Sequence, residues 1–355
     1  SRVRPRLLVL LDHAEDNLFE IDREMTSEWH FTRVESVLAD CKEGERMLEV
    51  MQRFKPEVVF HAAAYKHVGM MELNPVEAVR NNALATRVMA RVAGDIGTKV
   101  FVLVSTDKAV APATVMGASK ALAEWAIEAA QNRYHGTRFA AVRFGNVLGS
   151  SGSVVPLFRE QIRRGGPVTV THKDVIRYFM TIPEAAQLVL QAGSMGRGGD
   201  VFVLDMGKPV RIADLAKRMI SLMGLTVRDE ENPDGDIEIT YTGLRPAEKL
   251  FEELLIGTNV TGTEHSMILR AMEHSLPWHQ MQQVLDEMAL ALGRFDCDKA
   301  RTLLMETVAE YRPTGEIQDL VWARKTSLES VAMKNVTALQ PRRFRVGPPS
   351  GPGTH

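Results

Sequence analysis

The sequence is poor in the residues that build disulfide frameworks and metal-thiolate sites. Its two cysteines, Cys41 and Cys297, lie far apart and are not part of a Cys-x-x-Cys pattern. Small secreted domains are dense in cysteine, whereas proteins of a reducing compartment are not. The cysteine content therefore predicts a cytoplasmic protein without a metal site.

Long hydrophobic runs and a surplus of one charge are also missing. The apolar runs Leu7 to Leu11 and Phe101 to Val104 have the length of a strand and are far shorter than a membrane-spanning helix. The 43 basic and 45 acidic residues are interspersed and leave a net charge of −2. We therefore expect a soluble chain that does not bind nucleic acid and has no signal peptide before its first strand.

Glycine is absent before Gly44, which excludes a glycine-rich phosphate-binding turn after the first apolar run. That run, Leu7 to Leu11, ends in Asp12. In a dinucleotide-binding fold, a strand that ends in an acid is typical of the second strand, whose carboxylate accepts hydrogen bonds from the adenine ribose. The alternative is that Leu7 to Leu11 is the first strand of a fold that binds no nucleotide.

The most informative stretch runs from residue 100 to residue 120. Five apolar or β-branched residues are followed at once by Ser-Thr-Asp-Lys, a pattern typical of a buried parallel strand that ends in a polar cluster. Open α/β sheets bind their ligands at such strand ends. A helix that begins near Met116 sets Met116 and Lys120 one turn apart on one face. The side chains that we expect to share one small space are Thr106, Asp107, Lys108, Met116 and Lys120.

Ser-Thr-Asp-Lys-Ala at 105–109 and Met-Gly-Ala-Ser-Lys at 116–120 resemble the catalytic core of a known family. It is the bacterial nucleotide-sugar 4,6-dehydratases of the polysaccharide-biosynthesis (CapD-like) group, typified by UDP-N-acetylglucosamine 4,6-dehydratase. They belong to the extended short-chain dehydrogenase/reductases, whose usual tyrosine is Met116 here. The resemblance covers roughly Leu7 to Leu255 and, more weakly, continues to about Lys325.

The resemblance implies an α/β fold, namely a Rossmann-like doubly wound parallel sheet with a smaller C-terminal α/β substrate lobe. It implies that the βα unit with the glycine-rich NAD turn should stand before Asp12, so we expect the chain to lack that unit and the membrane segment. The full-length parent is expected at the cytoplasmic face of the inner membrane. The expected domains are a truncated NAD-binding domain at 1–165, rejoined by about 181–206, a substrate lobe with C-terminal helices at 166–180 and 207–330, and a disordered tail at 331–355.

The resemblance also implies roles for single residues. Asp107 would protonate the leaving hydroxyl, Lys108 would take the C5 proton, and Thr106 would assist at the 4-hydroxyl. Lys120 would bind the nicotinamide ribose, and neighbouring lysine charges are expected to depress each other's pKa. Met116 cannot accept a proton, so the work of the usual tyrosine is redistributed. The implied cofactor-binding residues are Asp12, Asp40, His61, Ala62, Ala63, Ala64, Asn82 and Lys120, and the implied substrate-binding residues are Lys66, His67, Asn146, Val155, Arg177, Arg245 and Glu248.

The implied function is the conversion of UDP-N-acetylglucosamine to its 4-keto-6-deoxy product with bound NAD, by a homo-oligomer that acts in surface polysaccharide synthesis. Two alternatives stay open. A UDP-sugar 4-epimerase would use the same scaffold and NAD but needs no acid and base for elimination. A catalytically silent UDP-sugar-binding protein would agree with the missing glycine-rich turn and with alanine at 85 and 247, where the family has glycine.

Overall fold

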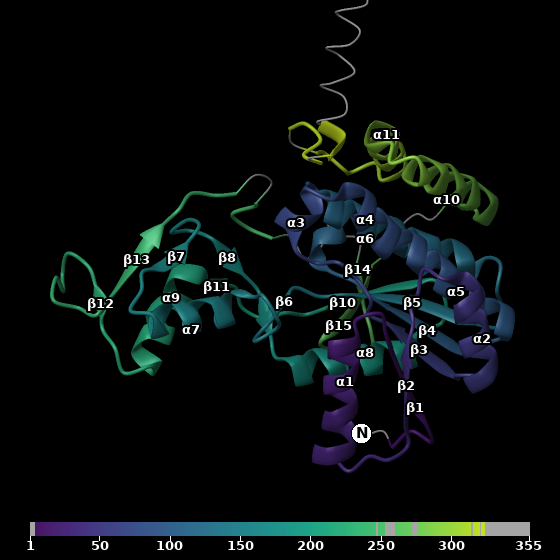
Figure 1. The fold of residues 1–355 in the computed structure, drawn as a ribbon, viewed down its shortest axis with the longest axis horizontal. Coiled ribbons are helices and arrows are strands. Elements are labelled where there is room, and N and C mark those ends of the chain that lie inside the picture. Colours follow the sequence, from purple (N-terminus) through teal and green to yellow (C-terminus); the bar gives the residue numbers. More distant parts are fainter. Residues whose placement is uncertain are drawn as a thin grey trace, which may run out of the picture.

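A computed structural model describes residues 4–245, 248–252, 260–271, 276–313, 315–319 and 321–323. A mostly parallel sheet forms the centre of the larger lobe, and a smaller lobe extends to the left in Figure 1. The sheet has the strand order β14-β15-β10-β5-β4-β3, in which β3, β4, β5 and β10 are parallel and β14 and β15 are antiparallel. Its strands are β3 (Val58–His61), β4 (Val100–Val104), β5 (Arg138–Arg143), β10 (Asp200–Leu204), β14 (Val260–Gly262) and β15 (Ile268–Ala271).

Helices cover both faces of this sheet, as the doubly wound arrangement requires. In β4, Phe101 and Leu103 pack on one side, whereas Val100 and Val102 pack on the other, because successive side chains of a strand point to opposite faces. All four are buried, which explains the continuous apolar run. The first face is covered by α2 (Gly44–Phe54), α5 (Ala85–Ile96) and α6 (Val115–Gln131), and the second by α8 (Ile182–Met195).

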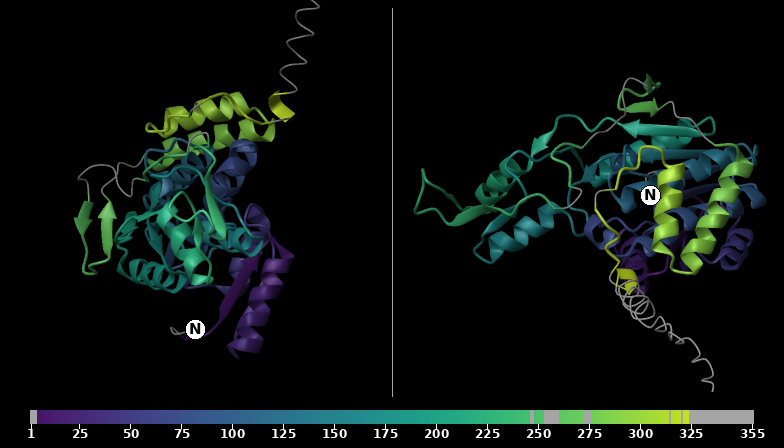
Figure 2. Two further views of the ribbon diagram at one scale, coloured as in Figure 1. Left: turned by 90° about the vertical axis from the view of Figure 1, so that its left-hand side faces the viewer. Right: turned by 90° about the horizontal axis from the view of Figure 1, so that it is seen from above.

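A separate pair of parallel strands stands beside the sheet. β1 pairs with β2 over its whole length, and within the described residues no ladder joins β1 to β3. The side chains of Val58 and Phe60 on the outer strand β3 are 46% and 43% exposed, so an apolar edge faces solvent there. This N-terminal part consists of β1 (Leu8–Asp12), α1 (Glu15–Arg23), η1 (Glu24–Glu28) and β2 (Val34–Leu38), drawn in purple in Figures 1 and 2.

The smaller lobe has its own hydrophobic core. Phe158 and Ile162 of α7 pack in it with Val168 and Ile220. The boundary expected at residue 165 is therefore wrong, because α7 packs on α9 and β7 and belongs to this lobe. Its elements are α7 (Val154–Arg163), β7 (Val168–Val170), β8 (Ile176–Arg177), β11 (Val210–Arg211), α9 (Ile212–Leu222), β12 (Val227–Arg228) and β13 (Ile237–Tyr241), while β6 (Asn146–Val147) pairs with β9 (Phe179–Met180) at its base.

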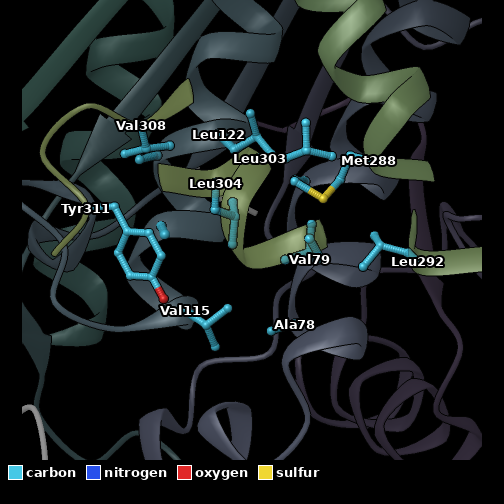
Figure 3. Close-up of a cluster of buried hydrophobic side chains, with 14 of the residues drawn as sticks. Ala78, Val79, Val115, Leu122, Met288, Leu292, Leu303, Leu304, Val308 and Tyr311 are labelled. Atoms are coloured by element: carbon cyan, nitrogen blue, oxygen red, sulfur yellow. The ribbon is translucent and has the colours of Figure 1, made fainter. Parts of the chain in front are cut away.

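The last described helices pack on the larger lobe. Leu122 of α6, Val79 and Val115 lie against Met288 and Leu304 in one hydrophobic cluster (Figure 3). Because β14 and β15 also extend the main sheet, the segment expected as substrate lobe at 207–330 is divided between the two lobes. The remaining helices are α3 (Val68–Glu72), α4 (Pro75–Val79), η2 (Arg80–Leu84), η3 (Asp107–Ala109), α10 (Trp278–Gly293) and α11 (Cys297–Thr307).

Two sequence expectations concern membranes and the tail. Among the described residues, no helix has both the length and the apolar character that a bilayer crossing needs. The tail expected at 331–355 lies outside the described residues.

Candidate functional site

The polar cluster forms a tight turn where β4 ends. Thr106 caps η3, and its hydroxyl donates to Oδ1 of Asp107 at 2.9 Å and accepts from the Lys108 backbone N–H at 3.3 Å. The same Oδ1 accepts from Nζ of Lys108 at 3.0 Å. Thr106, Asp107 and Lys108 are thus brought together as expected, with hydroxyl, carboxylate and ammonium in mutual contact.

Asp107 is placed to act on a bound molecule. The side chain is 2% exposed, and within the described part of the chain its Oδ2 has no hydrogen-bond partner although it is buried. A buried polar atom without a partner is costly and is typically reserved for a ligand or a reaction. Gly145 leaves room beside it, since a Cβ there would lie 3.2 Å from Oδ2.

The pKa of Lys108 is shifted in the direction opposite to the one that a lysine base needs. Burial alone would lower the pKa of Lys108, but the carboxylates of Asp107 and Glu252 outweigh it and raise that pKa above its ordinary value. Nζ lies 3.0 Å from Asp107 and 3.5 Å from Oε1 of Glu252. The expected depression by a neighbouring lysine is therefore wrong for Lys108, because two anions surround it.

Lys120 is the lysine whose pKa is lowered. Its side chain is 4% exposed, and Nζ donates to the Val104 carbonyl at 2.7 Å, so it reaches the end of β4 as the helical spacing predicts. Burial lowers the pKa of Lys120 to about 8, against the influence of Glu124, which raises it. The cause is burial and not a second lysine.

Met116 lies in the first turn of α6. It is 3% exposed and belongs to the hydrophobic cluster that also holds Ala109 and Leu122. Its place in the polar space stays a prediction from the sequence. The neighbouring Gly117 approaches η3 closely, because a Cβ there would lie 2.3 Å from the Lys108 carbonyl oxygen.

Gly117→Ala is accordingly expected to displace η3 from α6. A contact of 2.3 Å with a backbone atom cannot be relieved by a side-chain rotation, and overpacking of a closed core costs about 1–3 kcal/mol. We expect the free energy of unfolding, measured by urea titration, to fall by that amount. The matched control is Gly69→Ala in α3, where a Cβ meets nothing within 4 Å and stability should stay the same or rise. Equal stability of the two variants would contradict the close approach.

Asn82 joins three segments of the site. It lies in η2, a π-helical turn between α4 and α5, and is completely buried. Its side chain accepts from the Tyr65 N–H at 2.8 Å and donates to the Tyr65 carbonyl at 3.0 Å and to the Ser119 hydroxyl at 3.0 Å. Single π-helical turns inside helices often occur at functional sites. Here the turn fixes the loop after β3 against α6.

The loop after β3 leaves small side chains at the surface. Ala62 and Ala63 are exposed and Ala64 is half-buried, so a ligand can approach this backbone closely. His61, in contrast, is 4% exposed and its Nε2 lies 3.1 Å from the Thr86 hydroxyl. Burial lowers the pKa of His61 to about 3, so the ring is neutral. The ring therefore packs in the core, and the role of His61 in cofactor binding stays a prediction from the sequence.

Asp12 and Asp40 stand at the carboxyl ends of the separate strands. Asp12 ends β1 and accepts from the Ala14 N–H at 2.8 Å. Asp40 follows β2 and lies 3.1 Å from Nζ of Lys42. Burial opposes it, but hydrogen bonds from Lys42 lower the pKa of Asp40, so that its carboxylate stays charged. Both acids therefore offer carboxyl acceptors at strand ends, where dinucleotide-binding folds hold a ribose.

A cavity of about 460 Å³ lies beside the alanine loop and is lined in part by Ala64, Lys66, His67 and Met70. Nζ of Lys66 donates to the Ser151 carbonyl at 2.9 Å. The ring of His67 packs on the glycine- and serine-rich loop at 149–153. The approach is so close that a Cβ at Gly152 would lie 2.5 Å from the ring. The side chains of Lys66 and His67 thus connect the segment after β3, which contains the alanines at 62–64, to the loop at 149–153 that precedes the smaller lobe.

The residues assigned to the nucleotide sugar come from several elements of the smaller lobe. Asn146 in β6 is held by Tyr178, whose carbonyl accepts from its N–H at 3.1 Å and from its side chain at 3.3 Å. Val155 is half-buried in the first turn of α7. Arg245 is exposed, and its N–H donates to Oε2 of Glu248 at 3.1 Å.

Arg177 is fully engaged within the protein. Its guanidinium donates to the carbonyls of Ile176, Lys249 and Leu250 at 2.7, 2.9 and 3.2 Å. It also lies 3.5 Å from Oε1 of Glu248. Arg177 thus holds the segment 248–252, and its role in substrate binding stays a prediction from the sequence. The alanine expected at 247 as a departure from the family lies outside the described residues.

Sequence reasoning missed a buried ion pair beneath the site. Glu124 of α6 is 0% exposed, and both its oxygens accept from Nε of Arg143 at 3.0 Å. The hydroxyl of Ser105 also donates to Glu124. An acid one turn after Lys120 and an arginine inside an apolar strand were the available signals. In the described ranges, no group of His, Cys, Asp and Glu has the geometry of a metal site.

Comparison with known proteins shows the family of the chain. Residues 1–273 match the family model described as "Polysaccharide biosynthesis protein". The chain belongs to this family. It is 54% identical over 257 residues to the capsular polysaccharide biosynthesis protein CapD of Staphylococcus aureus, which covers 72% of this chain and 42% of the relative. The chain therefore spans less than half the length of that relative.

Two further matches are informative. The chain is 35% identical over 254 residues to a UDP-glucose 4-epimerase of Rickettsia massiliae, covering 70% of each chain. Among solved structures, it is similar to Pen from Bacillus thuringiensis, with a TM-score of 0.68 and 28% identity over 80% of this chain and 91% of that chain. The fold of this family member is thus an α/β Rossmann-like fold, as the sequence predicts.

Proposed function

We propose that the protein is a nucleotide-sugar 4,6-dehydratase that acts on UDP-N-acetylglucosamine. The observation that carries the proposal is the ion pair of the buried Asp107 and the half-buried Lys108 at the end of β4, in which Oδ2 of Asp107 has no partner among the described residues. Elimination of water needs a base at C5 and an acid at the 6-hydroxyl, and a carboxyl next to an amine supplies both. The match to polysaccharide biosynthesis proteins supports this assignment.

We propose NAD as the cofactor, and the residues present fit it. Exposed alanines after β3 permit close approach, Asp12 and Asp40 offer carboxyl acceptors at strand ends, and Lys120 reaches the end of β4. These residues would hold the adenosine and nicotinamide ends. The cofactor would supply the hydride chemistry, which is oxidation at C4 of the sugar and reduction at C6.

The proton count of the pair is consistent with elimination. The amine of Lys108 takes the C5 proton while the C–O bond at C6 breaks and Asp107 donates its proton to the departing hydroxyl as water. Lys108 becomes an ammonium and Asp107 a carboxylate, which is the ion pair at 3.0 Å in the structure. The pair becomes reactive when the ammonium passes its proton to the carboxylate. After elimination the ammonium would return its proton to C5 as hydride enters C6, and the proton lost from the 4-hydroxyl would re-protonate Asp107, which restores the reactive form. Thr106, bonded to the same oxygen, would assist at the 4-hydroxyl.

The second candidate is a 4-epimerase, which the likeness to a UDP-glucose 4-epimerase supports. Incubation with UDP-N-acetylglucosamine and NAD separates the two candidates. We expect a product that is lighter by one water and absorbs in the ultraviolet in base as a 4-keto sugar. An epimerised product of unchanged mass would replace the proposal by the second candidate. The homo-oligomer, the cytoplasmic location and the membrane-anchored parent remain predictions from the sequence.

A further inference from the structure

We propose that Glu252 is a positioning residue that holds Lys108 in its charged form and ties it to the smaller lobe through Arg177. Oε1 of Glu252 lies 3.5 Å from Nζ of Lys108 and 3.6 Å from Nε of Arg177. The three side chains are 11%, 24% and 12% exposed, so water screens these charges only partly. Only the effect on turnover rests on the function proposed above.

The segment that carries Glu252 is fixed from both lobes. Leu250 accepts at its carbonyl from the Ile176 N–H at 3.1 Å, which holds the segment along β8. Nζ of Lys249 donates to the Ala111 carbonyl at 3.2 Å, which holds it on the loop after η3. These contacts place the carboxylate of Glu252 next to Lys108, although the two residues lie far apart in the sequence. Glu252 is therefore held beside Lys108 by the fold, unlike a solvated surface charge.

The other charges near Lys108 are accounted for. Asp107 and Glu252 raise the pKa of Lys108, while burial and the charge of Arg177 lower it. On α6, which packs on η3, Lys120 is bonded to the Val104 carbonyl and Glu124 to Arg143. Removal of Glu252 would leave Lys108 with one anion, one cation opposing it and the burial penalty. The ammonium form should then be disfavoured.

This arrangement sets the proton state of Lys108. A lysine base must be neutral before it can take a proton. Glu252 favours the ammonium form of Lys108. It therefore opposes the transfer of a proton from Lys108 to Asp107. Because the same carboxylate contacts Arg177 in the smaller lobe, a displacement of the segment 248–252 from the catalytic turn would favour the reactive form of Lys108. The two lobes are thereby linked through one charge.

The test is the titration of Lys108 by competitive acetylation with trace acetic anhydride over a pH series, read by mass spectrometry of the Lys108 peptide. Only the neutral amine reacts, so the midpoint reports its pKa. In Glu252→Gln we expect the midpoint to fall by about one pH unit or more, because an opposite charge at this distance has been removed. The matched control is Glu248→Gln, which removes a charge from the same segment at a residue that contacts Arg177 and Thr171. Its Lys108 midpoint should stay near that of the wild type.

Turnover gives an independent readout. In Glu252→Gln the acidic limb of the pH profile of kcat/KM should move to lower pH together with the labelling midpoint, and Glu252→Asp should restore both in part. A purely structural role would lower the rate without moving the limb. An unchanged labelling midpoint in Glu252→Gln overturns the proposal, even if the enzyme dehydrates its substrate. A shifted midpoint in a protein that converts no nucleotide sugar would support the role of Glu252 and refute the proposed function instead.

Discussion

Lys108→Ala is expected to lower kcat for the dehydration of UDP-N-acetylglucosamine by about 10²–10⁴-fold, the usual contribution of a general acid or base. KM should change little, because the amine acts on a proton in the transition state and contributes little to ground-state binding. Asp107→Asn should give a loss of similar size, since the amide cannot donate the proton that the departing hydroxyl needs. Product is measured by the loss of one water in the mass spectrum.

The matched control is Lys99→Ala, which removes another lysine that is paired with a carboxylate. Lys99 lies 2.6 Å from Glu57, but the two side chains are 71% and 60% exposed and lie outside the site. Turnover should be unchanged in this variant. Lys108→Ala also leaves Asp107 buried without its cation, so thermal unfolding and UDP binding must show that the variant is folded. Full turnover in folded Lys108→Ala would refute the assigned mechanism.

The position of the site could be predicted from the sequence because it depends on local patterns. The buried strand β4, the polar turn that follows it and the helix with Lys120 are contiguous, and strand ends of open α/β sheets are where ligands bind. The structure brings Thr106, Asp107 and Lys108 together as the pattern indicates. Lys120 points at the end of the same strand.

The electrostatics of the site could not be predicted, because they depend on contacts between distant segments. Burial lowers the pKa of Lys108, whereas Asp107 and Glu252 raise it, and Glu252 reaches Lys108 only through the folding of distant segments. Arg177 was expected to bind the substrate, and the three carbonyls that use its donors could not be foreseen. Asn82 was expected to bind the cofactor, and the π-helical turn that directs its side chain to Tyr65 has no simple sequence signal.

The pair of Glu124 and Arg143 shows the same dependence on tertiary contacts, and it gives the largest expected effect on stability. Arg143 is 4% exposed and Glu124 is 0% exposed, so neither charge can be solvated if its partner is removed. Arg143→Met should therefore cost about 3–5 kcal/mol, the range found when one partner of a buried ion pair is deleted. Urea unfolding followed by circular dichroism measures the loss.

The double variant Glu124→Leu/Arg143→Met separates the cost of an unpaired buried charge from the loss of packing. Replacing both partners by apolar groups removes the need to solvate either charge, so most of the stability lost in the single variant should return. The surface pair Arg46 and Glu49 is the control, since its side chains are 54% and 68% exposed, and Arg46→Met should cost less than about 1 kcal/mol. If Arg143→Met is no more destabilising than Arg46→Met, the carboxylate of Glu124 does not depend on Arg143, and the prediction is wrong. If the double variant is as unstable as the single one, the pair stabilises the protein by its geometry beneath Ser105, and its charges contribute little.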